Sequence, residues 1–422
     1  MIRIIKLASR NLTRYYRRTI LTAGLIVIGI VAVLVFTAIS GAFKSHMVAQ
    51  ITDSMLGHIQ IHRKGYMASV ESLPLNLNIQ PEVAVKIKSM INEEEAVVSS
   101  TPRLKFAAMF SNFKESTNIR LNGIIPEREN QTVPLLAERF VEKSSELNGK
   151  PLLTKGGLLI PQLLAKGMNV SVGDSVVIVA TNEDGSVNGR RFQVQGVLEA
   201  VTGPGGRDGY LHIDDARTLL RIDGNEINEI AIRIKNINET EKTTAELERR
   251  IAAITSHGDM QSGPKKAIEV HTWEQLTPFS NIAAMIDLLD IFIRVMLVGI
   301  VLIAVMNVMI MSVYERIREI GTIAAIGTPP SRILGMFISE GFLIGLMGTA
   351  AGAAVSIVIV KAINTWQFTF AFGRQVIILA PVIAAGDIFI TGALVLAVSV
   401  FGSLQPALKA ARMNPITALR HV

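Results

Sequence analysis

The sequence contains no cysteine, and this absence removes several classes of function at once. Disulfide frameworks, thiolate metal sites, cysteine nucleophiles and lipid anchors on cysteine all need that side chain. Charged residues make up 18% of the chain and aromatic residues 5%, whereas about 25% of a typical soluble protein is charged. Because 49% of the 422 residues are hydrophobic, we expect a membrane protein with a water-soluble part.

The sequence also lacks the motifs of common catalytic and nucleotide-binding chemistry. It has no G-x-x-x-x-G-K-[ST] phosphate loop and no H-E-x-x-H zinc motif. His58 and His62 could bind a metal from one helical face, but the alternating GHIQIH favours a surface strand. The glycine-rich GPGGRDGY (203–210) could approach a phosphate or form a joint between subdomains. We therefore predict no catalytic residue, metal or cofactor in this chain.

Positive charge is concentrated in short segments beside apolar runs. Residues 1–18 carry six basic residues and no acidic one, and residues 314–332 and 406–422 are also basic on balance. The long stretch 44–287 is slightly acidic. Lys and Arg accumulate in the short cytoplasmic segments of membrane proteins. The pattern favours a membrane protein over a nucleic-acid-binding protein and predicts that both termini are cytoplasmic.

Four predominantly apolar runs are long enough to cross the roughly 30 Å hydrocarbon core as helices. They are residues 19–43, 288–313, 333–360 and 382–405. A signal peptide is the alternative for the first run, but its apolar part exceeds the usual core of about 7–15 residues. We predict an integral membrane α-helical protein with four transmembrane helices, one plus three, and residues 44–287 exported between the first and second.

The remaining segments connect or flank these runs. Three arginines at helical spacing within residues 1–18 predict a cytoplasmic amphipathic helix on the membrane surface, or a basic flank that only sets topology. Residues 361–381 are predicted to be a short periplasmic loop, and residues 406–422 a cytoplasmic tail.

The exported region alternates between helix and strand patterns, so we predict a large α+β periplasmic domain of two subdomains. The helix patterns are EVAVKIKSMI (82–91) and TEKTTAELERRIAAI (240–254), and a strand pattern is EINEIAIRIK (226–235). DSVVIVA (174–180) and RRFQVQGVLEAV (190–201) flank the turn signal NEDGSVNG and predict a hairpin. At this length the region can bury a core of its own.

The charged segment between the second and third runs carries an apolar stripe. Val313, Ile317, Ile320, Ala324 and Gly327 recur at helical spacing, and the charged residues lie away from them. The glycine and the two prolines that follow are a helix stop. A plain polar turn is the alternative, but it needs only a few residues. We expect a short amphipathic helix that binds a soluble partner.

The third run contains one acidic residue and a row of glycines. Glu340 lies about two turns inside the run, where an ionised group is costly and usually faces other helices or water. It is expected either to pair with a neighbouring helix or to transmit motion. Small residues let helices approach closely. Four of them are predicted to pack against another span or a second protomer, namely Gly341, Gly345, Gly348 and Gly352.

Several motifs resemble those of one family. ERIREIGTIAAIGTPPSRI (315–333) is similar to the signature of the MacB/FtsX-type ABC transporter permeases, and PALKAARMNPITALRHV (406–422) resembles their terminal motif. LLIPQLLAKGMNVSVGDSVVIV (158–179) is similar to a periplasmic segment of the family, and DGYLHIDDARTLL (208–220) to one of the LolC/LolE lipoprotein-release permeases. The resemblance covers nearly the whole chain.

This resemblance implies a permease subunit of a mechanotransmission-type ABC transporter in the bacterial inner membrane. ATP and magnesium would bind to a separate ATPase dimer, and this chain would bind no cofactor. The coupling helix to that ATPase would include Glu315, Arg316, Arg318, Glu319, Ile320 and Gly321. The other implied partners are a second permease protomer, identical or paralogous, and a periplasmic carrier or adaptor.

Within the family, the resemblance favours extraction of lipoproteins or other lipidated substrates toward the outer membrane. MacB-like efflux with a periplasmic adaptor and FtsX-like regulation of cell-wall hydrolases are the alternatives. Extraction predicts an apolar groove between the first and second spans of paired protomers. For each candidate lining residue, the alternative is that its side chain only faces lipid or packs within the bundle. The candidate lining residues are Val33, Phe36, Ile39, Phe43, Met47, Ile291, Val295, Val298 and Leu302.

Overall fold

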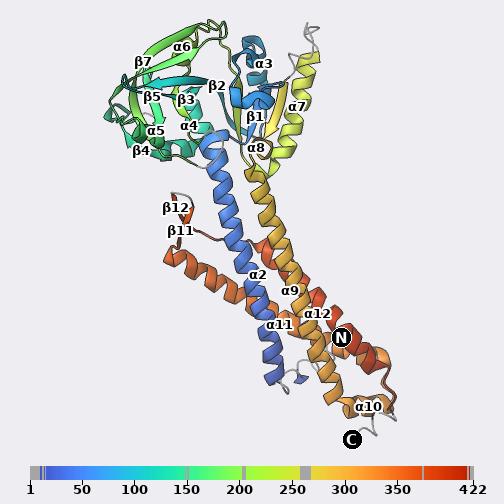
Figure 1. Ribbon diagram of the computed structural model, residues 1–422. Coiled ribbons are helices and arrows are strands. Elements are labelled where there is room, and N and C mark those ends of the chain that lie inside the picture. The colour runs from blue at the N-terminus through green and yellow to red at the C-terminus, as the bar shows by residue number, and fades with distance from the viewer. Residues whose placement is uncertain are drawn as a thin grey trace. The chain divides into compact units, whose positions relative to one another are not determined.

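The computed structural model describes residues 10–11, 14, 16–147, 149, 152–201, 206–256, 268–372, 375–415 and 418. The chain forms two compact units, which are shown in Figure 1. Residues 1–45 and 283–422 form a helix bundle, and residues 46–282 form a unit built around a sheet. The predicted fold class is confirmed, because the described residues contain four candidate membrane helices, one before and three after a large α+β domain in the sequence.

Four long helices make up the bundle, and each is apolar enough to cross a membrane. They are α2 (Tyr16–Ile51), α9 (Phe279–Glu315), α11 (Pro330–Trp366) and α12 (Ala385–Ala411). Both α9 and α11 have 37 residues, so each is about 55 Å long. That length exceeds the roughly 30 Å hydrocarbon core, so these helices continue beyond it.

The helices are longer than the apolar runs that indicated them. An apolar run ends where the side chains become polar, whereas the backbone hydrogen bonds of a helix continue past that point. The predicted loop 361–381 accordingly begins as helix and then forms a hairpin of β11 (Thr369–Phe372) and β12 (Gln375–Ile378). Most of the predicted amphipathic helix at residues 1–18 lies outside the described residues.

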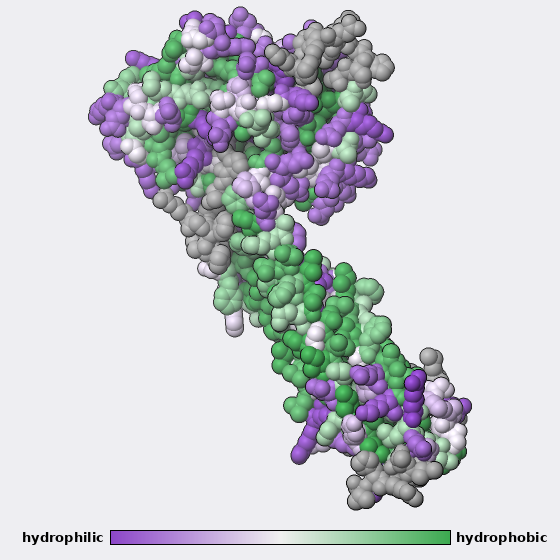
Figure 2. All heavy atoms as spheres, turned by 45° about the vertical axis from the view of Figure 1, so that its right-hand side comes forward, coloured by the Kyte–Doolittle hydropathy of each residue, from purple (hydrophilic) through white to green (hydrophobic). Residues whose placement is uncertain are grey.

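The core of the bundle contains apolar side chains from all four helices. Ile26 and Ile30 of α2, Val301 and Val305 of α9, and Phe337 of α11 are at most 1% exposed. On the face shown in Figure 2 the surface of the helices is also hydrophobic, while polar residues gather toward the end that carries α10. A helix that is apolar on all sides is suited to lipid rather than water.

Among the described residues of the second unit, ten strands form one sheet in the order β10-β1-β9-β2-β3-β8-β5-β7-β4, with β6 beside β2 and β7. Their bounds are β1 (Ile59–Arg63), β2 (Val97–Ser111), β3 (Ser116–Ile124), β4 (Phe140–Lys143), β5 (Gly157–Pro161), β6 (Ser175–Thr181), β7 (Val187–Leu198), β8 (Gly209–His212), β9 (Glu229–Ile234) and β10 (Ile268–Thr272). The helices of the unit are α3 (Pro81–Asn92), α4 (Pro126–Thr132), α5 (Gln162–Gly167), α6 (Ile213–Leu220), α7 (Thr240–Ser256) and α8 (Trp273–Leu276).

Strand β2 joins two halves of the sheet. Its first part, as far as Arg103, pairs with β9, and its second part, from Leu104, pairs with β3. The helix predictions at 82–91 and 240–254 are confirmed as α3 and α7. The predicted strand and hairpin are also confirmed, as β9 and as the antiparallel pair β6 and β7.

The prediction of a surface strand at GHIQIH is wrong. His58, Gln60 and His62 are 6%, 2% and 0% exposed, because β1 lies between β9 and β10. These polar side chains have buried partners instead of water; for example, Nε2 of His62 lies 3.2 Å from Oε2 of Glu229. In the glycine-rich segment 203–210, residues 203–205 lie outside the described residues, and the last two residues begin β8.

Candidate coupling site at the α10 end of the helix bundle

A short helix, α10 (Ile317–Ala325), connects α9 to α11. Helix α9 ends at Glu315, and Arg316 interrupts the helical backbone with a φ of −112° and a ψ of 17°. After α10, Gly327 has a φ of 94°, which residues with a Cβ rarely adopt, and α11 begins with a proline. The segment thus contains the helix that its apolar stripe predicted, and its role as a coupling helix stays a prediction.

The apolar face of α10 packs onto the bundle. Ile317 and Ile320 are 8% and 1% exposed, and Gly321 is also buried. Arg318 and Glu319 lie exposed on the other side. Three of the six predicted coupling residues, Arg316, Ile320 and Gly321, therefore face their own chain, and Glu315, Arg318 and Glu319 are accessible to a partner.

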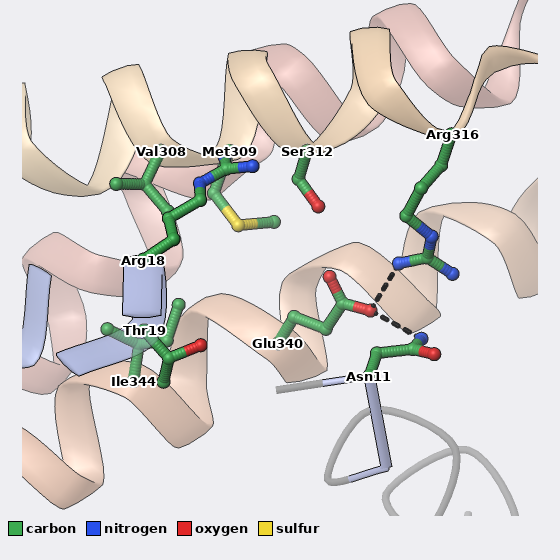
Figure 3. Close-up of a pocket in the computed structure, with 9 residues that line it drawn as sticks. All are labelled: Asn11, Arg18, Thr19, Val308, Met309, Ser312, Arg316, Glu340 and Ile344. Carbon is green, nitrogen blue, oxygen red and sulfur yellow. Dashed lines mark hydrogen bonds and ion pairs between the residues drawn. The ribbon is translucent and has the colours of Figure 1, made fainter. Parts of the chain in front are cut away.

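A buried ion pair fixes the start of α10, as Figure 3 shows. Nη1 of Arg316 lies 2.8 Å from Oε1 of Glu340, and the two side chains are 5% and 4% exposed. Asn11 donates a hydrogen bond to the same oxygen at 2.8 Å. Nε of Arg316 donates to Glu319 at 3.1 Å, and the guanidinium carbon lies 5.5 Å from the centre of the Phe337 ring. Glu340 thus pairs with the residue that separates α9 from α10.

The charge on Arg316 is retained in this environment. Burial disfavours the charged guanidinium, but the Glu340 and Glu319 carboxylates raise the pKa of Arg316 above its ordinary value. Breaking a buried ion pair by removing one partner costs about 3–5 kcal/mol, because it leaves an uncompensated charge. The pair therefore opposes any separation of α10 from α11.

Further polar contacts surround this pair. Arg18 and Glu315 are 3.0 Å apart, and Arg14 and Glu319 are 3.3 Å apart. Because the side chains of the second pair are 67% and 43% exposed, we expect it to stabilise the bundle by less than about 1 kcal/mol. The buried pair therefore contributes more to stability than the exposed pair.

A small pocket lies beside the ion pair, between α2, α9 and α11. Its lining combines the polar cluster with an apolar wall, and Figure 3 shows Asn11 and Arg316 converging on Glu340. The lining residues are Asn11, Arg18, Thr19, Val308, Met309, Ser312, Arg316, Glu340 and Ile344. No set of three His, Cys, Asp or Glu residues that could hold a metal ion occurs in the described part of the chain. The arrangement holds α2, α9 and α11 together.

The glycine row of α11 packs within the chain. A Cβ on Gly341 or Gly345 would lie 2.6–2.7 Å from serine atoms of α12. A Cβ on Gly348 would lie 2.5 Å from Ile26 of α2, and one on Gly352 would meet Ile30 of the same helix at 2.9 Å. The row was predicted to pack against another span or a second protomer, and in this structure it contacts other spans of the same chain.

The predicted groove residues are dispersed over different environments. Val33 and Met47 are 1% and 3% exposed, and Val33 belongs to the bundle core, so it does not line an open surface of this chain. Phe36, Ile39 and Phe43 are half-buried, and Val298 packs against the bundle core. Three α9 residues are exposed at the bundle surface, namely Ile291, Val295 and Leu302. The groove stays a prediction.

Sequence reasoning missed a second charge cluster in the bundle. Arg294 lies 2.8 Å from Asp290 on α9 and 3.4 Å from Asp387 on α12. Thr37 of α2 donates a hydrogen bond to Asp290. The sequence signal that could have revealed this cluster is the i, i+4 spacing of Asp290 and Arg294, which places oppositely charged side chains next to each other on a helix. For Asn11, which binds Glu340 across 329 positions, the sequence offers no signal.

Two family models match the chain. Residues 19–250 match the MacB-like periplasmic core domain, and residues 291–415 match the FtsX-like permease C-terminal domain. The first match covers more than half of the sequence. The chain belongs to the MacB/FtsX-type family of ABC transporter permeases.

Three relatives show the range of the family. The macrolide export ATP-binding/permease protein MacB of Nitrobacter winogradskyi is 28% identical over 95% of this chain and 58% of its own length. The lipoprotein-releasing system transmembrane protein LolC of Neisseria meningitidis is 20% identical over 100% of this chain and 98% of its own. The ABC transporter permease YknZ of Bacillus subtilis is 25% identical over 99% and 98%.

The chain therefore spans a little over half the length of the MacB relatives it matches, and nearly the full length of LolC and YknZ. The sequence identity to LolC is no higher than the identity to MacB or YknZ, so membership of the lipoprotein-release subgroup stays a prediction.

Proposed function

We propose that this permease is the membrane subunit of a mechanotransmission-type ABC transporter that is powered by a separate ATPase dimer. The observation that carries the proposal is the position of α10. Its apolar face is buried against the bundle, its exposed face is charged, and Arg316 ties it to Glu340. Such a helix can receive a push from a soluble partner and cannot move without moving the bundle.

The packing supports transmission through α9 and α11. Close-packed contacts transmit displacement with little compression. Ile320 of α10 shares one core with Val313 of α9 and with Ile333 and Phe337 of α11. Helix α9 continues without a break from Glu315 to Phe279, so a displacement at α10 extends along about 55 Å of helix.

The proposed orientation places α10 and both termini in the cytoplasm of a bacterial inner membrane and residues 46–282 in the periplasm. The basic segments 1–18 and 406–422 support this orientation. Because the chain has no cysteine, single cysteines report topology without background. In whole cells, a membrane-impermeant maleimide should label Val187→Cys and should leave Ile326→Cys unlabelled until the cells are opened. The reverse labelling would overturn the orientation.

The coupling role is tested with one charge reversal and a matched control. Arg318→Glu alters the exposed face of α10, and Lys361→Glu alters an exposed charge near the far end of α11. We expect the α10 variant to copurify with less ATPase subunit and to support less ATP hydrolysis, while the α11 variant behaves like the unmodified chain. Equal ATPase content and activity in both variants would contradict a coupling role for α10.

For the substrate we propose lipoproteins or other lipidated molecules, extracted from the inner membrane and passed to a periplasmic carrier. The full-length match to LolC and the exposed apolar residues of α9 support this choice. The MacB relatives favour export through a periplasmic adaptor as the second candidate.

Native mass spectrometry of the complex in mild detergent distinguishes the two substrate classes. Acylated peptides bound to the permease, and their loss in Val295→Trp but not in Phe389→Trp, would support extraction. Both residues are exposed, at 62% and 76%, but Phe389 lies on α12, outside the predicted groove. An adaptor protein without acylated cargo would favour export instead.

A further inference from the structure

Helix α11 ends in an aromatic elbow, which we define as Trp366, Gln367 and Phe368. The two aromatic rings form an edge-to-face pair with centres 5.9 Å apart. They are 73% and 52% exposed. Between them, Gln367 has a φ of 47° and a ψ of 54°, a left-handed conformation that costs free energy for a residue with a side chain. Gln367 is the C-cap of α11, a position at which helices commonly adopt this conformation, and the turn leaves both aromatic rings exposed.

The elbow has a defined shape. The backbone N–H of Leu379 donates to the carbonyl of Phe368 at 3.0 Å, and the Asn364 side chain donates to the carbonyl of Pro381 at 3.0 Å. Strands β11 and β12 pair directly after the elbow, with Thr369 opposite Ile378. The backbone of the turn is therefore held by hydrogen bonds on both sides.

Other apolar residues extend the exposed surface. Ile378 at the end of β12 is 57% exposed, and Val382 before α12 is 73% exposed. With Trp366 and Phe368 they form the elbow patch, a set of four large apolar side chains at one end of a membrane helix. Exposed apolar groups of this size favour contact with lipid or protein over water.

The length of α11 places the patch at a particular depth. Residues 341–360 carry no charge and span about 30 Å, which is the thickness of the hydrocarbon core. Glu340 precedes this run and the exposed Lys361 follows it. Trp366 lies five residues further along the helix, about 8 Å, within the headgroup layer. Tryptophan concentrates in that layer, because its ring is apolar and its N–H is polar.

We propose that the elbow patch is a lipid-binding anchor that inserts between headgroups and acyl chains at the end of α11 remote from Glu340. It fixes the depth of that end of the helix. A displacement at the Glu340 end then tilts α11 about the anchor instead of sliding it through the bilayer. The lipid contact itself does not depend on the proposed transport function.

The chain offers a direct test because it contains two tryptophans in opposite environments. Trp273 is 5% exposed in α8, and Trp366 is 73% exposed. The variant Trp273→Phe leaves Trp366 as the reporter, and the matched control Trp366→Phe leaves Trp273. Each full-length variant is reconstituted into phosphatidylcholine bilayers whose acyl chains carry bromine close to the glycerol end, and into the same bilayers without bromine.

We expect brominated lipid to remove most of the Trp366 emission, aqueous iodide to remove little of it, and neither quencher to affect Trp273. Trp366 emission that iodide quenches and bromine does not would place the elbow in water and overturn the proposal. Emission that neither quencher affects would show that protein covers the patch, which also overturns it. If Trp273→Phe does not fold, the difference in emission between the unmodified chain and Trp366→Phe gives the same quantity.

Discussion

A buried charge cluster lies at the junction of the two sheet halves, and the loss of stability on disrupting it can be estimated. Nη1 of Arg103 lies 2.7 Å from Glu229, and Nε of Arg103 donates to Glu129 at 3.0 Å. Lys105 lies 2.6 Å from Glu229, and His62 lies 3.2 Å from the same carboxylate. Arg103, Glu129 and Glu229 are at most 2% exposed. The cluster links β1, β2, β9 and α4 where β2 changes its partner from β9 to β3.

The perturbation is Glu229→Gln, which keeps the shape of the side chain and removes its charge. Lys105 and His62 then lose the carboxylate that they contact, and Arg103 retains only Glu129. Removing one partner of a buried ion pair costs about 3–5 kcal/mol. A domain of roughly 150–250 residues loses about 2–4 °C of melting temperature for each kcal/mol, so we expect a decrease of about 6–20 °C.

The assay follows thermal unfolding of the full chain in detergent through Trp273, the buried tryptophan of the same unit, with Trp366 replaced by Phe. The matched control is Glu246→Gln, which removes an exposed charge 2.9 Å from Arg249 on α7. An exposed pair of this kind contributes less than about 1 kcal/mol, so the control should melt within a few degrees of the unmodified chain. Equal melting temperatures for Glu229→Gln and Glu246→Gln would refute the reasoning.

Three further predictions concern pH, the coupling site and helix packing. Burial lowers the pKa of His62, so the unfolded chain binds a proton below about pH 6.5 that the folded chain does not bind, and the sheet unit should lose stability as the pH falls through this range. Burial alone would raise the pKa of Glu229, but its basic neighbours hold that pKa well below the usual value, so a further loss should follow below about pH 4.5. A midpoint of urea unfolding that is constant between pH 7 and about pH 3 would contradict both statements. Glu340→Gln should lower the melting temperature of the bundle and weaken the link between ATP hydrolysis and transport; an unchanged ratio of ATP hydrolysed to substrate released would show that the ion pair is only structural. Gly348→Val should destabilise the bundle by about 1–3 kcal/mol through overpacking against α2, whereas Gly335→Ala, whose Cβ meets nothing within 4 Å, should be neutral or stabilising, when unfolding of the bundle is followed through Trp366 in the Trp273→Phe background.

The sequence predicts those parts of the fold that depend on local pattern. The four membrane helices follow from hydropathy, and α10 follows from an apolar stripe of helical spacing. Strand β1 shows where this reasoning fails. Its polar residues suggested a surface, but His62 is buried against Glu229, which lies 167 positions away. A buried polar residue and an exposed one look alike until the partner is known.

The same limit applies to the candidate site. The sequence shows that Glu340 needs a partner and that the glycines of α11 allow close approach. It does not show that the partner is Arg316, or that Gly341 contacts α12 while Gly348 contacts α2. Those pairings depend on how the helices cross, which the packing of all four helices determines together.

The two charge clusters of the bundle lie at the C-terminal end of α9 and near its middle, and their positions bear on how the helix moves. Directly after the last residue of α9, Arg316 is tied to Glu340 of α11, and near the middle of the helix, Arg294 is tied to Asp387 of α12. Between them, α9 contributes the apolar side chains of Leu297, Val301, Val305 and Met309 to the bundle core. In a membrane, apolar side chains contact lipid about as well as they contact one another, so these contacts resist sliding weakly. The Arg316–Glu340 pair resists sliding strongly, because separating buried charges is costly, and the partly exposed Arg294–Asp387 pair contributes less. We therefore expect a push on α10 to tilt α9 and α11 together, without changing the register between them.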